Sequence, residues 1–344
     1  MCGIVGFTGN NEAAPILLDG LSKLEYRGYD SAGIAVRNGD AEPEIVKAKG
    51  KLKVLKEMTN DGKAVKGACG IGHTRWATHG GVTDTNAHPH ACGRVTLVHN
   101  GIIENYQELA AKYGFGDKLS SQTDTEVVAA LLDYYYEGDP GVAVFQTVRE
   151  LKGTFALAVL FEDIPDTIYA IRNVSPIIAG VGKDAGESFL ASDVTALTDY
   201  VEQYFVLPEY TLAALSEDGI TLTNDKGEII EPKLLRADWK IGSTGKCGYD
   251  YYMEKEIMEQ PRVMTETLLS RLKGGLPDFT TDQIPDSLWA QYDKITIIGC
   301  GTAMHAGLVA KGMLQGILGI PTTVEIASEF IYEHPVVDLS LIHI

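Results

Sequence analysis

The chain has 344 residues, of which 45% are hydrophobic and 22% charged, and its formal net charge is −18. These values are typical of a globular protein of about two domains, and the negative charge argues against nonspecific binding to nucleic acids or anionic membranes. The five cysteines are scattered without a CxxC pair, and no basic-then-apolar leader opens the chain. We therefore expect free thiols, no signal peptide and a cytoplasmic location.

The first 235 or so residues combine helical periodicity with many short β-type runs. Helices are predicted at Ala13–Leu24, Ile102–Tyr113 and Thr125–Tyr136, with Thr123 and Glu126 as a capping box before the last one. Strands are predicted at residues 2–9 and at Gly33–Val36, Cys69–His73, Val95–His99, Phe155–Phe161, Ile168–Ile171, Ile177–Val181 and Phe189–Ala191. This mixture predicts a layered α+β domain.

The composition changes after that domain. A polar, Gly-rich linker is expected at Asp238–Asp250, followed by helical character over Tyr251–Lys273, with Pro261 as a kink or a helix start. A βαβ unit is then predicted from Lys294–Ile298, Ala303–Leu318 and Thr323–Ile326. Because one such unit leaves both faces of its sheet uncovered, we expect the chain to end inside its second domain. Residues 339–344 match one frame of a transposon-end adaptor used in DNA library preparation, so we expect them not to be native.

Cys2 directly follows the initiator Met1. Removal of Met1 would leave a residue that carries both a thiol nucleophile and an α-amine with a pKa of about 7.7–8.0, close enough to neutrality to act as a base. This pattern indicates an N-terminal nucleophile hydrolase. A small residue at position two is also common in proteins without this chemistry.

The segment His73–Gly81 places Arg75, Trp76, Thr78 and His79 before a Gly-Gly pair. Arginine offers a bidentate fork for a carboxylate, tryptophan an apolar lid, and Gly-Gly a hinge; the alternative is a strand end and turn around a buried Trp. Five histidines also cluster in sequence, but without the spacing of a known ligand set, so no metal site is expected. These are His73, His79, His88, His90 and His99.

Three further positions are candidates for the same chemistry. Asn100 and Gly101 could supply an amide and a backbone N–H to an oxyanion, unless they form an ordinary Asn-Gly turn. Asp124 could bind an ammonium group, although aspartate is also favoured in a first helical turn. Arg27 could brace the N-terminal strand or the site, or simply belong to a polar turn.

Together these segments resemble the N-terminal-cysteine glutamine amidotransferases of the glucosamine-6-phosphate synthase type, the isomerising glutamine–fructose-6-phosphate aminotransferases. The matching stretches, in chain order, are CGIVG, LEYRGYDSAG, HTRWATHG, NAHPH, VHNGIIEN, TDTE and MEKEIMEQP. The resemblance runs to about residue 337. Sister families share the Cys-Gly-Ile start, but MEKEIMEQP followed by Gly299-Cys300-Gly301-Thr302 points to a sugar-isomerase domain.

The resemblance implies a four-layer αββα N-terminal-nucleophile hydrolase domain at 2–238, a linker with the first isomerase helices at 239–288, and a truncated α/β sugar-isomerase (SIS) domain at 289–338. It also implies that Cys2 attacks glutamine, that Asn100 and Gly101 hold the oxyanion, and that Arg75 and Asp124 bind the α-carboxylate and α-ammonium. Thr78 and His79 would line the pocket under the Trp76 lid.

In that family, the ammonia converts fructose 6-phosphate to glucosamine 6-phosphate without a metal or organic cofactor, often in a homodimer. Gly301 and Thr302 would cradle the sugar phosphate, although Ala303 stands where the family usually has Ser. We expect this polypeptide to act only as a glutaminase. The alternatives are an N-terminal-Cys amidotransferase with another acceptor and a noncatalytic sugar-phosphate-sensing module.

Overall fold

The computed structural model describes residues 2–116, 119–236, 247–280, 284, 287 and 292–333. It divides into two compact units, Met1–Cys247 and Gly248–Ile344. The expected non-native residues 339–344 and most of the expected linker lie outside the described residues.

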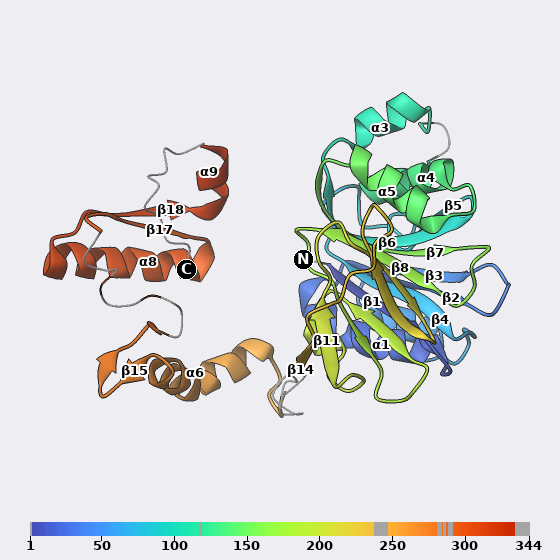
Figure 1. Cartoon of the computed structure of the whole chain (residues 1–344). Coiled ribbons are helices and arrows are strands. Elements are labelled where there is room, and N and C mark those ends of the chain that lie inside the picture. Colours follow the sequence, from blue (N-terminus) through green and yellow to red (C-terminus); the bar gives the residue numbers. More distant parts are fainter. Residues whose placement is uncertain are drawn as a thin grey trace. The chain divides into compact units, whose positions relative to one another are not determined.

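The first unit contains two antiparallel sheets (Figure 1). The eight-stranded sheet has the order β14-β11-β9-β10-β1-β4-β2-β3, and the six-stranded sheet the order β13-β12-β8-β7-β6-β5. The strands are β1 (Gly3–Thr8), β2 (Ser31–Arg37), β3 (Glu44–Lys49), β4 (Cys69–Arg75), β5 (His90–Cys92), β6 (Val95–Ile103), β7 (Gly153–Phe161), β8 (Ile168–Asn173), β9 (Ile178–Val181), β10 (Ser188–Ala191), β11 (Gln203–Val206), β12 (Leu212–Ser216), β13 (Gly219–Thr223) and β14 (Leu235–Arg236).

Helices cover the outer face of each sheet. Figure 1 shows α1 on one side of the sheets and α3, α4 and α5 on the other. The helices of this unit are α1 (Ala13–Leu24), α2 (Leu52–Met58), α3 (Tyr106–Tyr113), α4 (Asp124–Tyr135) and α5 (Pro140–Glu150). The result is the four-layer αββα arrangement that the resemblance implies.

Three buried apolar clusters lie in this unit, one for each junction between layers. The middle cluster joins the two sheets through side chains such as Ile4, Ile71 and Leu160. The outer clusters join α1 and α2 to the larger sheet and α3, α4 and α5 to the smaller one. Since β1 and β4 lie between two layers, every residue of both strands is buried, including the polar residues His73, Thr74 and Arg75 at the end of β4.

The structure corrects one predicted boundary next to the site. The helix expected at Ile102–Tyr113 begins only at Tyr106, because Ile102 and Ile103 continue β6 and pair with Thr154 and Gly153 of β7. Apolar spacing alone did not separate the end of the strand from the start of the helix. The elements of this unit that had no predicted counterpart are β3, β5, β11, β12, β13, β14, α2 and α5.

The second unit contains the expected βαβ element. Strands β17 (Ile295–Gly299) and β18 (Thr322–Ile326) are parallel and are joined by α8 (Gly301–Met313), which continues as a π-helix to Leu318. The unit also contains α6 (Tyr252–Leu269), β15 (Leu272–Lys273), β16 (Leu276–Pro277) and α9 (Ala327–Tyr332).

Helix α6 ends earlier than the sequence analysis predicted. Leu272 and Lys273 pair with Pro277 and Leu276 in a hairpin, and the turn between them, Gly274-Gly275, has positive φ angles of 60° and 82°. Such a turn joins antiparallel strands and cannot continue a helix. No helix among the described residues is long and apolar enough to cross a membrane.

Candidate active site

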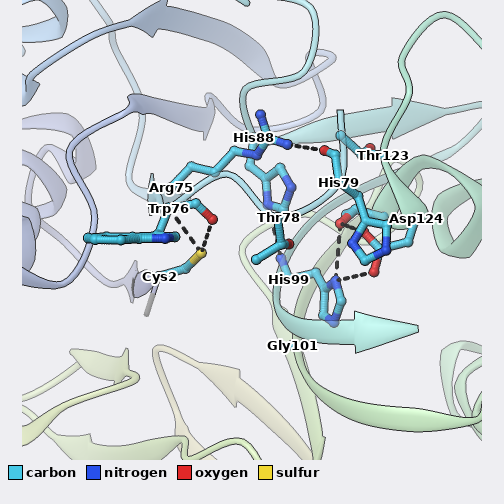
Figure 2. A pocket seen from close by; sticks show the side chains of 11 residues that line it. Cys2, Arg75, Trp76, Thr78, His79, His88, His99, Gly101, Thr123 and Asp124 are labelled. Atoms are coloured by element: carbon cyan, nitrogen blue, oxygen red, sulfur yellow. Dashed lines mark hydrogen bonds and ion pairs between the residues drawn. The ribbon is translucent and has the colours of Figure 1, made fainter. Parts of the chain in front are cut away.

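Cys2 lies immediately before β1, beside the end of β4. The register pairs Gly3 with Thr74, so the next residues outward, Cys2 and Arg75–Trp76, come together. The Cys2 Sγ accepts a hydrogen bond from the Trp76 N–H at 3.3 Å and lies 3.6 Å from the Trp76 carbonyl oxygen (Figure 2). Burial raises the pKa of the Cys2 thiol, although the Trp76 N–H and nearby positive charge oppose this shift.

One pocket collects most of the residues that the sequence analysis singled out. Its cavity volume is about 20 Å³, and it opens partly to solvent. The predicted residues that line it are Cys2, Arg75, Trp76, Thr78, His79, Gly101 and Asp124. The lining residues that were missed are His88, His99, Thr123 and Thr125. These four residues lie in the stretches NAHPH, VHNGIIEN and TDTE. The match of these stretches to the family was the sequence signal that could have identified them as site residues.

Asn100 and Gly101 lie near the end of β6. Asn100 is not among the pocket-lining residues, but its Nδ2 donates to the Cys2 carbonyl oxygen at 3.2 Å. Gly101 has a φ of 137°, and a Cβ built there would lie 2.0 Å from the Thr154 carbonyl oxygen. Glycine is therefore required at this position for β6 to pair with β7.

Asp124 begins α4 on another side of the pocket. It is 5% exposed, and its Oδ2 accepts from the Ile103 N–H at 2.9 Å and lies 3.9 Å from His99 Nδ1. The capping box expected here forms only in part. Thr123 Oγ1 caps the Glu126 N–H at 3.3 Å, but the Glu126 carboxylate accepts from the backbone N–H groups of Ser120 and Ser121 instead of reaching back to Thr123.

The Arg75 guanidinium holds the loop that follows β4. It donates to the carbonyl oxygen of Gly81 at 3.2 Å and to that of His79. Burial lowers the pKa of Arg75, while Cys2 and Asp124 raise it. The Trp76 ring is 45% exposed and meets Tyr29 edge-on at 5.5 Å. The hydrogen bonds of Arg75 thus go to backbone carbonyl oxygens of this loop, and Trp76 forms an apolar part of the pocket lining.

Three of the five clustered histidines, His73, His88 and His90, pack against one another. The His73 and His88 rings stack with centroids 4.2 Å apart, and His88 meets His90 edge-on at 4.8 Å. Burial lowers the pKa of His73 and of His90 to about 3, so both rings are neutral at ordinary pH. Among the described residues, no group of three or more His, Cys, Asp or Glu side chains could hold a metal ion.

The remaining predicted residues lie outside the pocket. Arg27 is buried and donates to an Asp193 carboxylate oxygen at 2.9 Å and to the Ser192 carbonyl oxygen at 3.3 Å. Since Ser192 Oγ accepts from the Ile4 N–H at 2.9 Å, Arg27 braces the turn beside β1. Gly301 and Thr302 belong to the second unit, where they begin α8, and Gly301 has a φ of 56°.

Several known proteins are similar to this chain in sequence. Residues 73–199 match the family described as glutamine amidotransferase domain. The chain is 44% identical to the glutamine–fructose-6-phosphate aminotransferase (isomerizing) of Clostridium tetani, over 98% of this chain and 56% of that protein. The protein of the same name from Symbiobacterium thermophilum gives the same three values of 44%, 98% and 56%. The chain thus spans about half the length of these curated relatives.

Two solved structures share the fold. The glutamine phosphoribosylpyrophosphate amidotransferase of B. subtilis, in complex with ADP and GMP, has a TM-score of 0.58 at 18% identity, covering 94% of this chain and 65% of that one. The structure described as the allosteric regulatory enzyme of purine biosynthesis has a TM-score of 0.55 at 24% identity, covering 70% of this chain and 50% of that one. The chain therefore contains a glutamine amidotransferase domain with the N-terminal-nucleophile fold, and it is homologous to the glutamine–fructose-6-phosphate aminotransferases.

Proposed function

We propose that this chain hydrolyses glutamine to glutamate and ammonia through a thioester on Cys2. The observation that carries the proposal is the position of the Cys2 thiol, which lies in the pocket with Gly101 and Asp124 while the Asn100 amide donates to the backbone of Cys2. The proposal requires that Met1 is removed, so that the α-amine of Cys2 is free.

The chemistry follows from these groups. The α-amine takes the thiol proton as Sγ attacks the side-chain amide carbon of glutamine, and the Asn100 Nδ2 and the Gly101 N–H stabilise the oxyanion. The proton then passes to the leaving nitrogen, ammonia departs, and a γ-glutamyl thioester remains. Water attacks the thioester and releases glutamate and the thiol.

Substrate recognition is proposed for the pocket walls. Arg75 would release its loop carbonyls and bind the α-carboxylate of glutamine bidentately. Asp124, the buried carboxylate of the pocket, would bind the α-ammonium. Thr78 and His79 would contact the substrate under Trp76, and Arg27 would support the position of β1.

We also propose the use of the ammonia. The proposed domains are a glutaminase domain at 2–238, a linker at 239–288 and the first part of an SIS domain at 289–338. In a longer protein with a complete SIS domain, that domain would use the ammonia to convert fructose 6-phosphate to glucosamine 6-phosphate. Gly301 and Thr302 would hold the sugar phosphate at the first turn of α8. The proposed longer protein is a cytoplasmic homodimer. The 344-residue polypeptide is expected to release glutamate but to make no glucosamine 6-phosphate.

The test compares glutamine hydrolysis by the wild type, Cys2→Ala and Cys2→Ser. The matched control is Cys92→Ala, which changes another half-buried thiol of the same unit. We expect activity to disappear in Cys2→Ala and to persist in Cys92→Ala. Intact-mass measurement should show that Met1 is absent. Equal activity of Cys2→Ala and wild type would reject the nucleophile, and an active protein that retains Met1 would reject the role of the α-amine.

A further inference from the structure

His73 lies on β4, behind the pocket and outside its lining. The side chain is fully buried. Its Nε2 lies 3.0 Å from the carbonyl oxygen of His99 and 3.0 Å from the Oδ1 of Asn100. Its Nδ1 is also buried and has no hydrogen-bond partner in the described part of the chain. All the polar contacts of this ring therefore pass through one nitrogen.

The two contacts of Nε2 together determine where the ring proton lies. A backbone carbonyl oxygen can only accept a hydrogen bond, so the contact with His99 requires that Nε2 carries the proton. The Asn100 atom that faces the same N–H must then be the amide oxygen. Consequently the Asn100 Nδ2 is directed the other way, to the Cys2 carbonyl oxygen at 3.2 Å.

We propose that His73 is a positioning residue for glutamine hydrolysis, which holds the Asn100 amide with its N–H donors directed toward the reacting centre at Cys2. The inference rests on the proposed function, because it assigns His73 to the oxyanion site of that reaction. If the amide were reversed, Asn100 would present an oxygen to the developing oxyanion, and a stabilising contact would become a repulsive one.

The surroundings of His73 keep this arrangement fixed. The ring stacks on His88 with an angle of 29° between the planes, and His88 Nδ1 in turn accepts from the His99 N–H at 3.4 Å. The backbone of His99 therefore acts on both rings. Its carbonyl oxygen accepts the Nε2 proton of His73, and its N–H donates to His88, on which His73 stacks. Burial favours the neutral form of the ring, so the positions of donor and acceptor do not change over the working pH range.

The first experiment separates positioning from structure by kinetics. His73→Leu removes the donor, whereas His73→Gln retains an N–H near the place of Nε2. Loss of an oxyanion donor lowers kcat by about 10²–10³-fold, so we expect His73→Leu to lower kcat by roughly 10- to 100-fold with little change in KM. His73→Gln should recover most of the loss. His90→Leu is the matched control, because His90 is buried in the same cluster but bonds to Thr123, and its kcat should stay within about threefold of wild type.

The double variant tests whether the effect passes through Asn100. Once Asn100→Ala has removed the amide, His73→Leu should lower kcat by no further factor, because residues that act as a unit are not additive. Three results would overturn the proposal: an equal additional loss in the Asn100→Ala background, an effect confined to KM, or a His73→Gln variant as impaired as His73→Leu.

A measurement on the unchanged protein covers the case in which a variant does not fold. With ¹⁵N-labelled histidine and through-bond assignment in the wild-type protein, the His73 ring should appear as the neutral Nε2–H form from pH 5 to 8. The groups that face it, His88, His99 and Arg75, should not change that form. A proton on Nδ1, or a charged ring, would refute the inference even if Cys2→Ala is inactive. A fully active Cys2→Ala would refute the proposed function whatever the state of His73.

Discussion

Gly101→Ala is the perturbation for which the structure gives the most definite expectation. A Cβ at this position would lie 2.0 Å from the Thr154 carbonyl oxygen, 2.7 Å from its carbon and 2.9 Å from His99 Nε2. Two of these three atoms belong to backbone and cannot rotate away. The methyl group therefore has to separate β6 from β7 at the Gly101–Phe155 pair.

The magnitude has two parts. A non-glycine residue at a φ of 137° is strained by about 1–3 kcal/mol. Separation of the strands adds the loss of one or two backbone hydrogen bonds, at roughly 1 kcal/mol each. We expect the free energy of unfolding to fall by about 2–5 kcal/mol, which corresponds to a Tm lower by roughly 10 °C for a unit of this size.

The assay is thermal unfolding followed by circular dichroism, together with glutamine hydrolysis at a temperature at which the variant is folded. Gly114→Ala is the matched control, since its φ is 69° and a Cβ there would meet nothing within 4 Å. Gly114→Ala should lower the free energy of unfolding by only about 1–2 kcal/mol, the strain of an alanine in the left-handed region. The folded Gly101→Ala protein should also lose kcat. Equal Tm values for the two variants would show that the contact with Thr154 has no energetic weight.

Three further outcomes are expected. Asn100→Ala should lower kcat by about 10²–10³-fold at nearly constant KM; a change in KM alone would contradict the oxyanion role. Because burial raises the pKa of Cys2 above its usual 9.0, alkylation of this thiol by iodoacetamide should accelerate steadily as the pH rises to 9, with Cys2→Ala as the background. An alkylation rate that no longer rises above pH 7 would refute the raised pKa of the Cys2 thiol. His90 has a pKa of about 3 when folded against 6.5 when unfolded, so its neutral burial contributes stability above pH 6.5 that is lost as the pH falls toward 3. The loss is about 1.4 kcal/mol per pH unit, and His90→Gln should therefore show a shallower decrease of Tm between pH 6.5 and 5, whereas parallel decreases would exclude this linkage.

Secondary structure was predictable from the sequence where a segment has one strong period. Ala13–Leu24 was placed at both ends as observed, because its apolar residues Ile16, Leu17, Leu21 and Leu24 recur at helical spacing. The start of α3 was not predictable in this way. Ile102 and Ile103 suit a strand or a helix equally, and only the pairing with β7 decides between them.

The sequence by itself supplied the candidate residues and, through the joint resemblance of its motifs to one family, the expected chemistry. No single motif was specific, because an Asn-Gly pair and an aspartate in a first helical turn also have ordinary structural roles. What only the tertiary structure decided is how the candidate residues are held. The fold brings Cys2 beside Trp76 through the β1–β4 register and places His73 behind Asn100. The physical reason is that residues far apart in sequence become neighbours only when strands pair and layers pack, and no local pattern encodes that contact.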